Sequence, residues 1–325
     1  MRTRRTPTRA QRDATATPPQ SCIVVLPSAF IPWAAPISPN SSAKAQSHQT
    51  IHPPRADPLI VSPLSRPIIA SRCRHHFCYN SIYRGILTGC NDAFLVDDST
   101  RDRLISQDHR TVEILRPILR GRDIDRYRAN WAGLWLIDNH NGYNNIPPVQ
   151  VTDYPAVKKH LDQYYNTLAA RHDKGITPYN LRNCAYHAEF SKRKLFWMDM
   201  SDRGRFCLSD STVFCNDKGF ILTGPSLRYL CAVLNSRLVS WLMERTGLTT
   251  GMGLVQWKKF AVEAIPIPKL SAKEERPFHR LVDTILSTKD ANHSADISSH
   301  QADLDRRVYQ LYGLTTREIA AVSRS

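Results

Sequence analysis

Long apolar runs and familiar catalytic motifs are missing from this 325-residue chain, and acidic residues are scarce in its first part. No uninterrupted apolar run reaches about 18 residues, so no transmembrane helix is expected. There is no glycine-rich dinucleotide loop after a strand, no Walker lysine loop, no zinc-protease helix motif and no serine nucleophile elbow. The glycine-rich residues 247–253 follow a predicted helix, which favours a flexible loop over a phosphate cradle. The sequence therefore indicates no catalytic residue.

The eight cysteines do not form a disulfide framework, because they lie far apart in a chain too long to need one. The only tight cluster is Cys73-Arg-His75-His76-Phe-Cys78. A C-x4-C pair with two histidines can hold zinc, but no second ligand pair follows at finger spacing. We therefore expect free thiols in a reducing cytoplasm and no metal site.

Positive charge is in excess but unevenly spread. The chain has 44 Lys and Arg against 29 Asp and Glu, which gives a net charge of +15. Residues 1–74 hold ten basic and two acidic residues, and residues 75–325 hold 34 and 27. The net charge of residues 75–325 is therefore +7, and that of the much shorter residues 1–74 is +8, so the later part is only mildly basic. An excess of this size indicates a polyanionic partner, such as nucleic acid.

The N-terminal segment differs in composition from the rest. Residues 1–70 contain 12 of the 21 prolines, and the first Glu of the chain is Glu113. Because proline removes backbone donors and fixes φ, we expect residues 1–75 to be disordered. Five arginines before the apolar residues 22–35 also resemble a targeting sequence, although Pro27 and Pro32 interrupt that stretch. A third interpretation is an out-of-frame segment in a truncated or frameshifted gene.

From about residue 80 the sequence predicts a folded α+β domain. Expected strands, some joined by turns, cover residues 82–96, 135–137, 194–198, 205–208, 212–215, 219–222 and 260–267. Expected helices cover residues 101–107, 154 to before 175, 226–244, 277–286 and 302–312, and residues 112–119 are helical or extended. Strands and helices mix without regular βαβ alternation. We predict a mixed-strand domain over residues 76–270 and a helical C-terminal extension over residues 271–325.

Five stretches in order make residues 80–325 recognisable as a whole. They are Tyr83-Arg-Gly-Ile-Leu-Thr-Gly-Cys-Asn-Asp-Ala-Phe94, Ile114-Leu-Arg-Pro-Ile-Leu-Arg-Gly-Arg-Asp-Ile124, Tyr154-Pro-Ala-Val-Lys-Lys-His-Leu161, Leu234-Asn-Ser-Arg-Leu238 with Ala264-Ile-Pro-Ile-Pro268, and Val308-Tyr-Gln-Leu-Tyr-Gly-Leu-Thr-Thr-Arg-Glu-Ile319. Together they resemble the C-terminal specificity region of TaqI-like adenine-specific DNA methyltransferases, which include fused type IIG restriction–modification enzymes.

The resemblance implies double-stranded DNA as the partner and loops that contact it. The residues expected near DNA are Arg84, Thr88, Asn91, Arg120, Arg122, Arg126, Lys258 and Lys259. Arginine suits guanine and asparagine suits adenine in the major groove, and other cations contact phosphates. Structural alternatives remain open: Thr88 and Asn91 would only tie a turn, and Asp123 would only clamp Arg120 or Arg122.

The sequence departs from the family where chemistry is expected. A relative should carry an S-adenosylmethionine loop and an Asn-Pro-Pro-Tyr-type tetrad for the flipped adenine, and neither is present. Asn145-Ile-Pro-Pro148 resembles this tetrad by chance only, because it lacks the aromatic residue that stacks on the base. We therefore expect no cofactor in this chain and a truncated gene, or a separate catalytic subunit that the chain serves in trans. A remnant or protein-interaction domain that binds no DNA is the competing hypothesis.

The genomic DNA upstream of the chain tests the truncation. We expect an S-adenosylmethionine loop and an Asn-Pro-Pro-aromatic tetrad in one of the three frames. An intact methyltransferase gene beside this one, with neither motif in the upstream frames, would instead indicate a separate specificity subunit.

Overall fold

A computed structural model describes residues 80–247, 249–250 and 253–324. The strands are β1 (Ser81–Arg84), β2 (Leu95–Asp97), β3 (Leu115–Leu119), β4 (Leu134–Ile137), β5 (Lys194–Met198), β6 (Met200–Ser201), β7 (Cys207–Ser209), β8 (Phe214–Cys215), β9 (Gly219–Thr223) and β10 (Val255–Gln256). The α-helices are α2 (Asn91–Phe94), α3 (Asp98–Gln107), α4 (Pro155–Asp162), α5 (Tyr165–Ala170), α6 (Leu227–Leu234), α7 (Arg237–Thr246), α8 (Lys259–Glu263), α9 (Ala272–Ala291), α10 (Ser298–Tyr312) and α11 (Thr316–Ser323). Short 3-10 helices are η2 (His109–Ile114), η3 (Gly121–Asp123), η4 (Val151–Asp153) and η5 (His187–Ser191).

This mixture of sheets and helices confirms the α+β fold class and the helical C-terminal region. The expected disorder of residues 1–75 and the Cys73–Cys78 cluster fall outside the described residues. The boundaries proposed for the domains stay a prediction.

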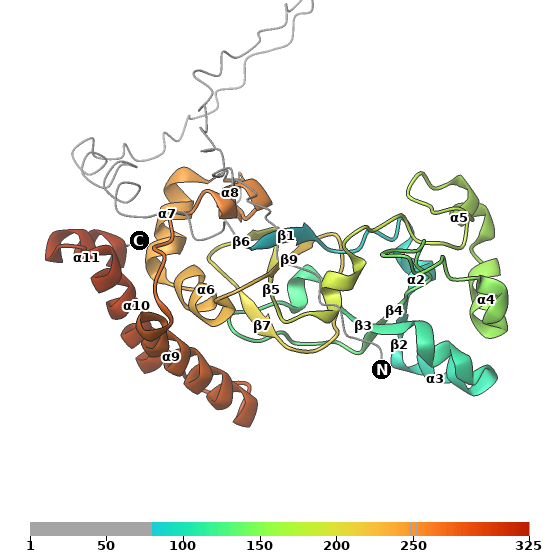
Figure 1. Cartoon of the computed structure of the whole chain (residues 1–325), viewed down its shortest axis with the longest axis horizontal. Coiled ribbons are helices and arrows are strands. Elements are labelled where there is room, and N and C mark those ends of the chain that lie inside the picture. The colour runs from blue at the N-terminus through green and yellow to red at the C-terminus, as the bar shows by residue number, and fades with distance from the viewer. Residues whose placement is uncertain (1–79, 248, 251–252, 325) are drawn as a thin grey trace, which may run out of the picture. The chain divides into compact units, whose positions relative to one another are not determined.

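Figure 1 shows the four-stranded antiparallel sheet of order β1-β9-β5-β7. Side chains on its two faces belong to two different hydrophobic cores. Successive side chains of a strand point to opposite faces of its sheet. On β5, Leu195 and Trp197 therefore join one core, and Phe196 joins the other. Both faces of β5 and β9 are covered, which explains why these strands read as continuous apolar runs.

The first core joins one face of this sheet to helices α6, α7 and α9–α11. Leu230 on α6, Val282 on α9 and Val308 on α10 are fully buried in it. A capping box starts α9: the Ser271 backbone N–H donates to Glu274 at 2.8 Å, and the Glu274 N–H donates to the Ser271 hydroxyl at 3.4 Å. In the described ranges, no helix is long and apolar enough to cross a membrane.

The second core lies under a sheet of order β2-β4-β3-β8 and helix α4. Its β3 runs parallel to β8, with Ile118 opposite Phe214 and Leu119 opposite Cys215. Because the two strands end together, the segment after β3 meets the turn between β8 and β9. This meeting brings together loops that lie about a hundred residues apart in the sequence.

Two of the expected helices are each divided in two. The predicted helix over residues 226–244 breaks at Asn235 because the Asn235 side chain pairs with the backbone of Phe206, accepting at 2.9 Å and donating at 2.8 Å. Ser236 then caps the start of α7. The helix expected from Tyr154 onward is likewise divided into α4 and α5.

Two expected strands are wrong. Residues 260–267 begin as α8, since Val262 and Ile265, three residues apart, are both buried while Phe260 is 62% exposed. Residues 91–94, expected as a turn running into a strand, form the short helix α2. A short apolar run does not distinguish a helical turn from a strand, and tertiary packing decided both cases.

Lys194 provides a test of how buried polar groups hold the sheet. Its side chain has no solvent exposure, and its ammonium donates to the carbonyls of Phe190 (2.6 Å), Lys192 (3.0 Å) and Ser211 (2.8 Å). We expect Lys194→Met to lower the free energy of unfolding by about 2 kcal/mol, because three carbonyls lose their donor. Chemical denaturation measures this, with the exposed Lys159→Met as the matched control. Equal or greater stability of Lys194→Met would mean that the cost of burying the ammonium dominates.

Candidate nucleic-acid interface

The turn of residues 216–218, between β8 and β9, is fixed by the end of β1. The Gly85 N–H donates to Gly219 O at 2.9 Å, and the Ile86 N–H donates to Cys215 O at 2.7 Å. A Cβ atom on Gly85 would lie 2.0 Å from the backbone oxygen of Asn216. Only glycine permits this approach, so the sequence Arg-Gly-Ile after β1 positions the turn.

Two cations share one carboxylate on this turn. The Arg84 guanidinium donates to the Asp217 backbone oxygen at 2.9 Å and to Oδ2 at 3.2 Å. The Lys218 ammonium lies 3.5 Å from the same Oδ2. The side chains of Arg84 and Lys218 are 51% and 65% exposed, whereas that of Asp217 is 16% exposed. The carboxylate orients the cations, and their charge faces solvent.

The turn η3 brings the Arg120–Asp123 loop to the same place. Asp123 is buried and accepts both Arg120 Nε at 3.0 Å and Arg120 Nη2 at 2.9 Å, which raises the pKa of Arg120 above its usual range. The expected clamp by Asp123 is therefore present on Arg120. Gly121 packs on Lys218, whose backbone oxygen would lie 3.3 Å from an added Cβ. Arg122 is exposed, and within the described ranges no ion pair involves it.

Lys258 is linked to the 216–218 turn through Asp199. Its ammonium donates to Asp199 Oδ2 at 2.6 Å, and the Asp199 N–H donates to Lys218 O at 2.8 Å. Lys259 is exposed and lies 3.7 Å from Glu263 one helical turn later, so its charge is shared along α8. We define Arg84, Arg122, Lys218 and Lys258 as the basic cluster, because the segments that carry them all contact the 216–218 turn or its partner Asp199.

Thr88 and Asn91 lie apart from the basic cluster and tie their own turn. The Thr88 hydroxyl is buried, donates to Asn91 Oδ1 at 2.7 Å and accepts from the Cys90 N–H at 3.3 Å. The alternative that these side chains tie a turn therefore describes the free protein. Contact of Asn91, which is exposed, with DNA stays a prediction.

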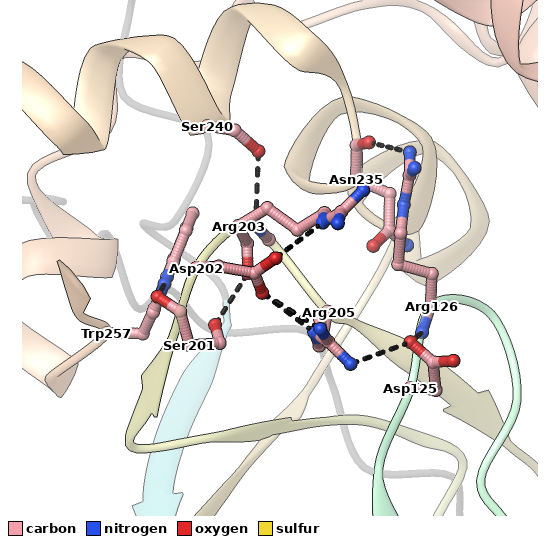
Figure 2. A network of polar contacts seen from close by, with 10 residues as sticks. Asp125, Arg126, Ser201, Asp202, Arg203, Arg205, Asn235, Ser240 and Trp257 are labelled. Carbon is pink, nitrogen blue, oxygen red and sulfur yellow. Dashed lines mark hydrogen bonds and ion pairs between the residues drawn. The ribbon is translucent and has the colours of Figure 1, made fainter. Parts of the chain in front are cut away.

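Arg126 belongs to a structural network (Figure 2). Its Nη2 donates to the Asn235 backbone oxygen at 2.5 Å, where α6 ends. Beside it, Arg205 bridges Asp202 at 2.9 Å and Asp125 at 3.4 Å. These contacts join the loop before β4 to the helices, and a role of Arg126 at DNA stays a prediction.

Sequence reasoning missed Lys218. No basic run or motif surrounds it, but the residues Asn-Asp-Lys-Gly between two predicted strands are a turn signal. A charged side chain at a tight turn between two strands is presented to solvent. The described residues contain no group of three or more His, Cys, Asp or Glu side chains suited to a metal ion.

Comparison with known proteins gives a family match over part of the chain. Residues 116–267 match the family model of the TaqI-like C-terminal specificity domain. The match runs from β3 to just past α8 and includes Arg122, Lys218 and Lys258, while Arg84 precedes it. This part of the chain is therefore similar to the TaqI-like specificity domain of restriction–modification enzymes, and the resemblance expected from the sequence is confirmed.

A solved structure, that of MmeI, shows a similar fold. The type IIL restriction–modification enzyme MmeI, determined in complex with DNA, is 13% identical with a TM-score of 0.58; the alignment covers 74% of this chain and 34% of MmeI. The type IIG restriction endonuclease BpuSI is 15% identical with a TM-score of 0.43, over 75% of this chain and 32% of BpuSI. This chain thus spans about a third of the length of either enzyme. None of the curated proteins matches it.

Gly85 tests the anchoring of the basic cluster. We expect Gly85→Ala to lower the free energy of unfolding by about 2 kcal/mol or more, because the added methyl group meets backbone that cannot move aside easily. Ser81→Ala, at an exposed position of the same strand, should change it by less than about 0.5 kcal/mol. Denaturant titration of both variants measures the difference, and wild-type stability of Gly85→Ala would show that the close approach does not constrain the fold.

Proposed function

We propose that this chain supplies the DNA target-recognition part of a site-specific adenine DNA methyltransferase of a restriction–modification system, of type IIG or a related type. The basic cluster carries this proposal: three of its four cations lie within the matched specificity domain, on loops that a rigid sheet presents to solvent. Exposed cations on a fixed backbone are suited to phosphate contacts that set the register of a protein on duplex DNA.

Methyl transfer is assigned to a catalytic part outside the described residues. The glycine-rich sequence of residues 247–253 follows helix α7. A loop that binds a nucleotide cofactor instead runs from a strand into a helix. Tyr143 and Ile146 exchange backbone hydrogen bonds of 3.0 and 2.7 Å, so Asn145 and Ile146 lie in a tight turn of residues 143–146. These residues do not fit S-adenosylmethionine. We propose that the gene of this chain is truncated, with the cofactor-binding part lost, or that a separate catalytic subunit holds the cofactor.

The charges of the basic cluster distinguish DNA recognition from a protein-interaction domain. A protein that neutralises phosphates releases counterions, so its affinity falls with salt at a slope of about 0.9 for each phosphate contacted. In a domain that binds no DNA, the basic cluster would make no contribution to a salt dependence of DNA affinity.

The test uses the full chain and matched removal of charge. We expect Arg122→Ala with Lys218→Ala to reduce the slope of log affinity against log salt by about 2 on duplex DNA. The control, Lys159→Ala with Lys273→Ala, removes the same charge from exposed positions on α4 and α9 and should leave the slope nearly unchanged. Fluorescence anisotropy over a series of salt concentrations measures both. Equal slopes for the two double variants would contradict the proposal.

A further inference from the structure

A second polar surface adjoins the basic cluster, and its residues Arg182 and Asn183 were assigned no role by the sequence analysis or the family match. Residues 84–87 after β1 and residues 181–187 before β5 line a cleft of about 210 Å³. Its polar rim consists of Arg84, Arg182 and Asn183, all exposed. Arg84 belongs both to this cleft and to the basic cluster, so the two surfaces are continuous.

The loop that carries Arg182 and Asn183 is held rigidly on its N-terminal side. Arg171 is buried, and its guanidinium donates to the carbonyls of Thr88, Pro178 (3.0 Å) and Asn180 (2.5 Å). Asn180 is also buried, and its amide donates to Val149 O at 2.9 Å and to His140 O at 3.2 Å. Buried donors thus fix the loop backbone immediately before its exposed residues.

The loop is held equally firmly on its C-terminal side. His187 is buried, and its Nε2 lies 2.9 and 3.0 Å from the two carboxylate oxygens of the buried Asp138. Tyr186 stacks on Tyr83 with ring centroids 4.7 Å apart. Arg182 and Asn183 are therefore exposed on a short segment whose backbone is fixed at both ends by buried contacts.

We propose that Arg182 and Asn183 read base edges of duplex DNA and set part of the target sequence; this rests on the proposed function. Arginine makes a paired contact with O6 and N7 of guanine, and asparagine makes one with N6 and N7 of adenine. Asn183 carries no charge to attract a phosphate, and the basic cluster next to it already supplies phosphate contacts. A paired contact to a base needs accurate placement, which the buried network around the loop provides.

Arg182 is oriented without being neutralised. Its Nη1 lies 3.3 Å from Asp173 Oδ1, and the two side chains remain 60% and 37% exposed. An exposed pair of this kind is weak in water and screened by salt, so the guanidinium can exchange the carboxylate for a base.

The test is a selection of preferred sequences from a randomised DNA duplex library, with the full chain as bait. We expect the wild type to select a consensus. Arg182→Lys should lose the preference for guanine at one position, because lysine keeps the charge but lacks the planar two-pronged donor. Asn183→Ala should lose a preference for adenine at another position. Each variant should discriminate the wild-type base there about 10-fold less well than the wild type does.

The control and the failing outcomes separate this inference from the proposed function. Arg317→Lys makes the same substitution at an exposed position on α11 and should keep the whole consensus. If both loop variants keep the wild-type consensus, or if the wild type binds duplexes without selecting any sequence, the base-reading role is overturned while DNA binding stands. Failure of the wild type to retain duplex DNA at low salt overturns the proposed function itself, and the inference with it.

Discussion

The close approach of Gly85 to the 216–218 turn is the constraint on which both candidate DNA-contacting surfaces depend. It joins the first strand of the described chain to a turn more than a hundred residues later, with backbone hydrogen bonds donated by the glycine and by Ile86 after it. Arg84 precedes this glycine, and its position beside Asp217 follows from the contact. Arg84 belongs both to the basic cluster and to the cleft that Arg182 lines.

Buried polar groups hold the loops around this contact. Arg171, Asn180 and Lys194 are all buried, and each donates to at least one backbone carbonyl outside the helices and strands. The backbone carbonyls of a loop are not paired by a regular hydrogen-bond ladder as those of a helix or a strand are. A buried side chain therefore donates hydrogen bonds to them. The result is a set of rigid loops on a mixed sheet, which suits recognition of a surface as regular as duplex DNA.

The sequence predicted the elements with strong local signals and missed those decided by packing. The strand over Lys194–Met198 was predicted with its observed bounds because a continuous apolar run there is bounded by charge and turn residues. The break at Asn235 was missed, since it depends on a hydrogen bond to Phe206 far away in the sequence. Among the predicted site residues, Arg84, Arg122 and Lys258 are carried by segments that contact the 216–218 turn or Asp199, whereas Thr88 and Arg120 bond within their own loops.

By itself, the amino-acid sequence determined the α+β class, the apolar strands and helices, and a resemblance that residues 116–267 bear out. Periodicity and composition act locally, so they can be read along the chain. Only the tertiary structure decided that Lys218, Arg182 and Asn183 lie beside Arg84, and that Asp123 binds Arg120 while Arg122 is left exposed. The parallel pairing of β3 with β8 and the close contact at Gly85 bring these residues together, and neither is encoded in a local pattern.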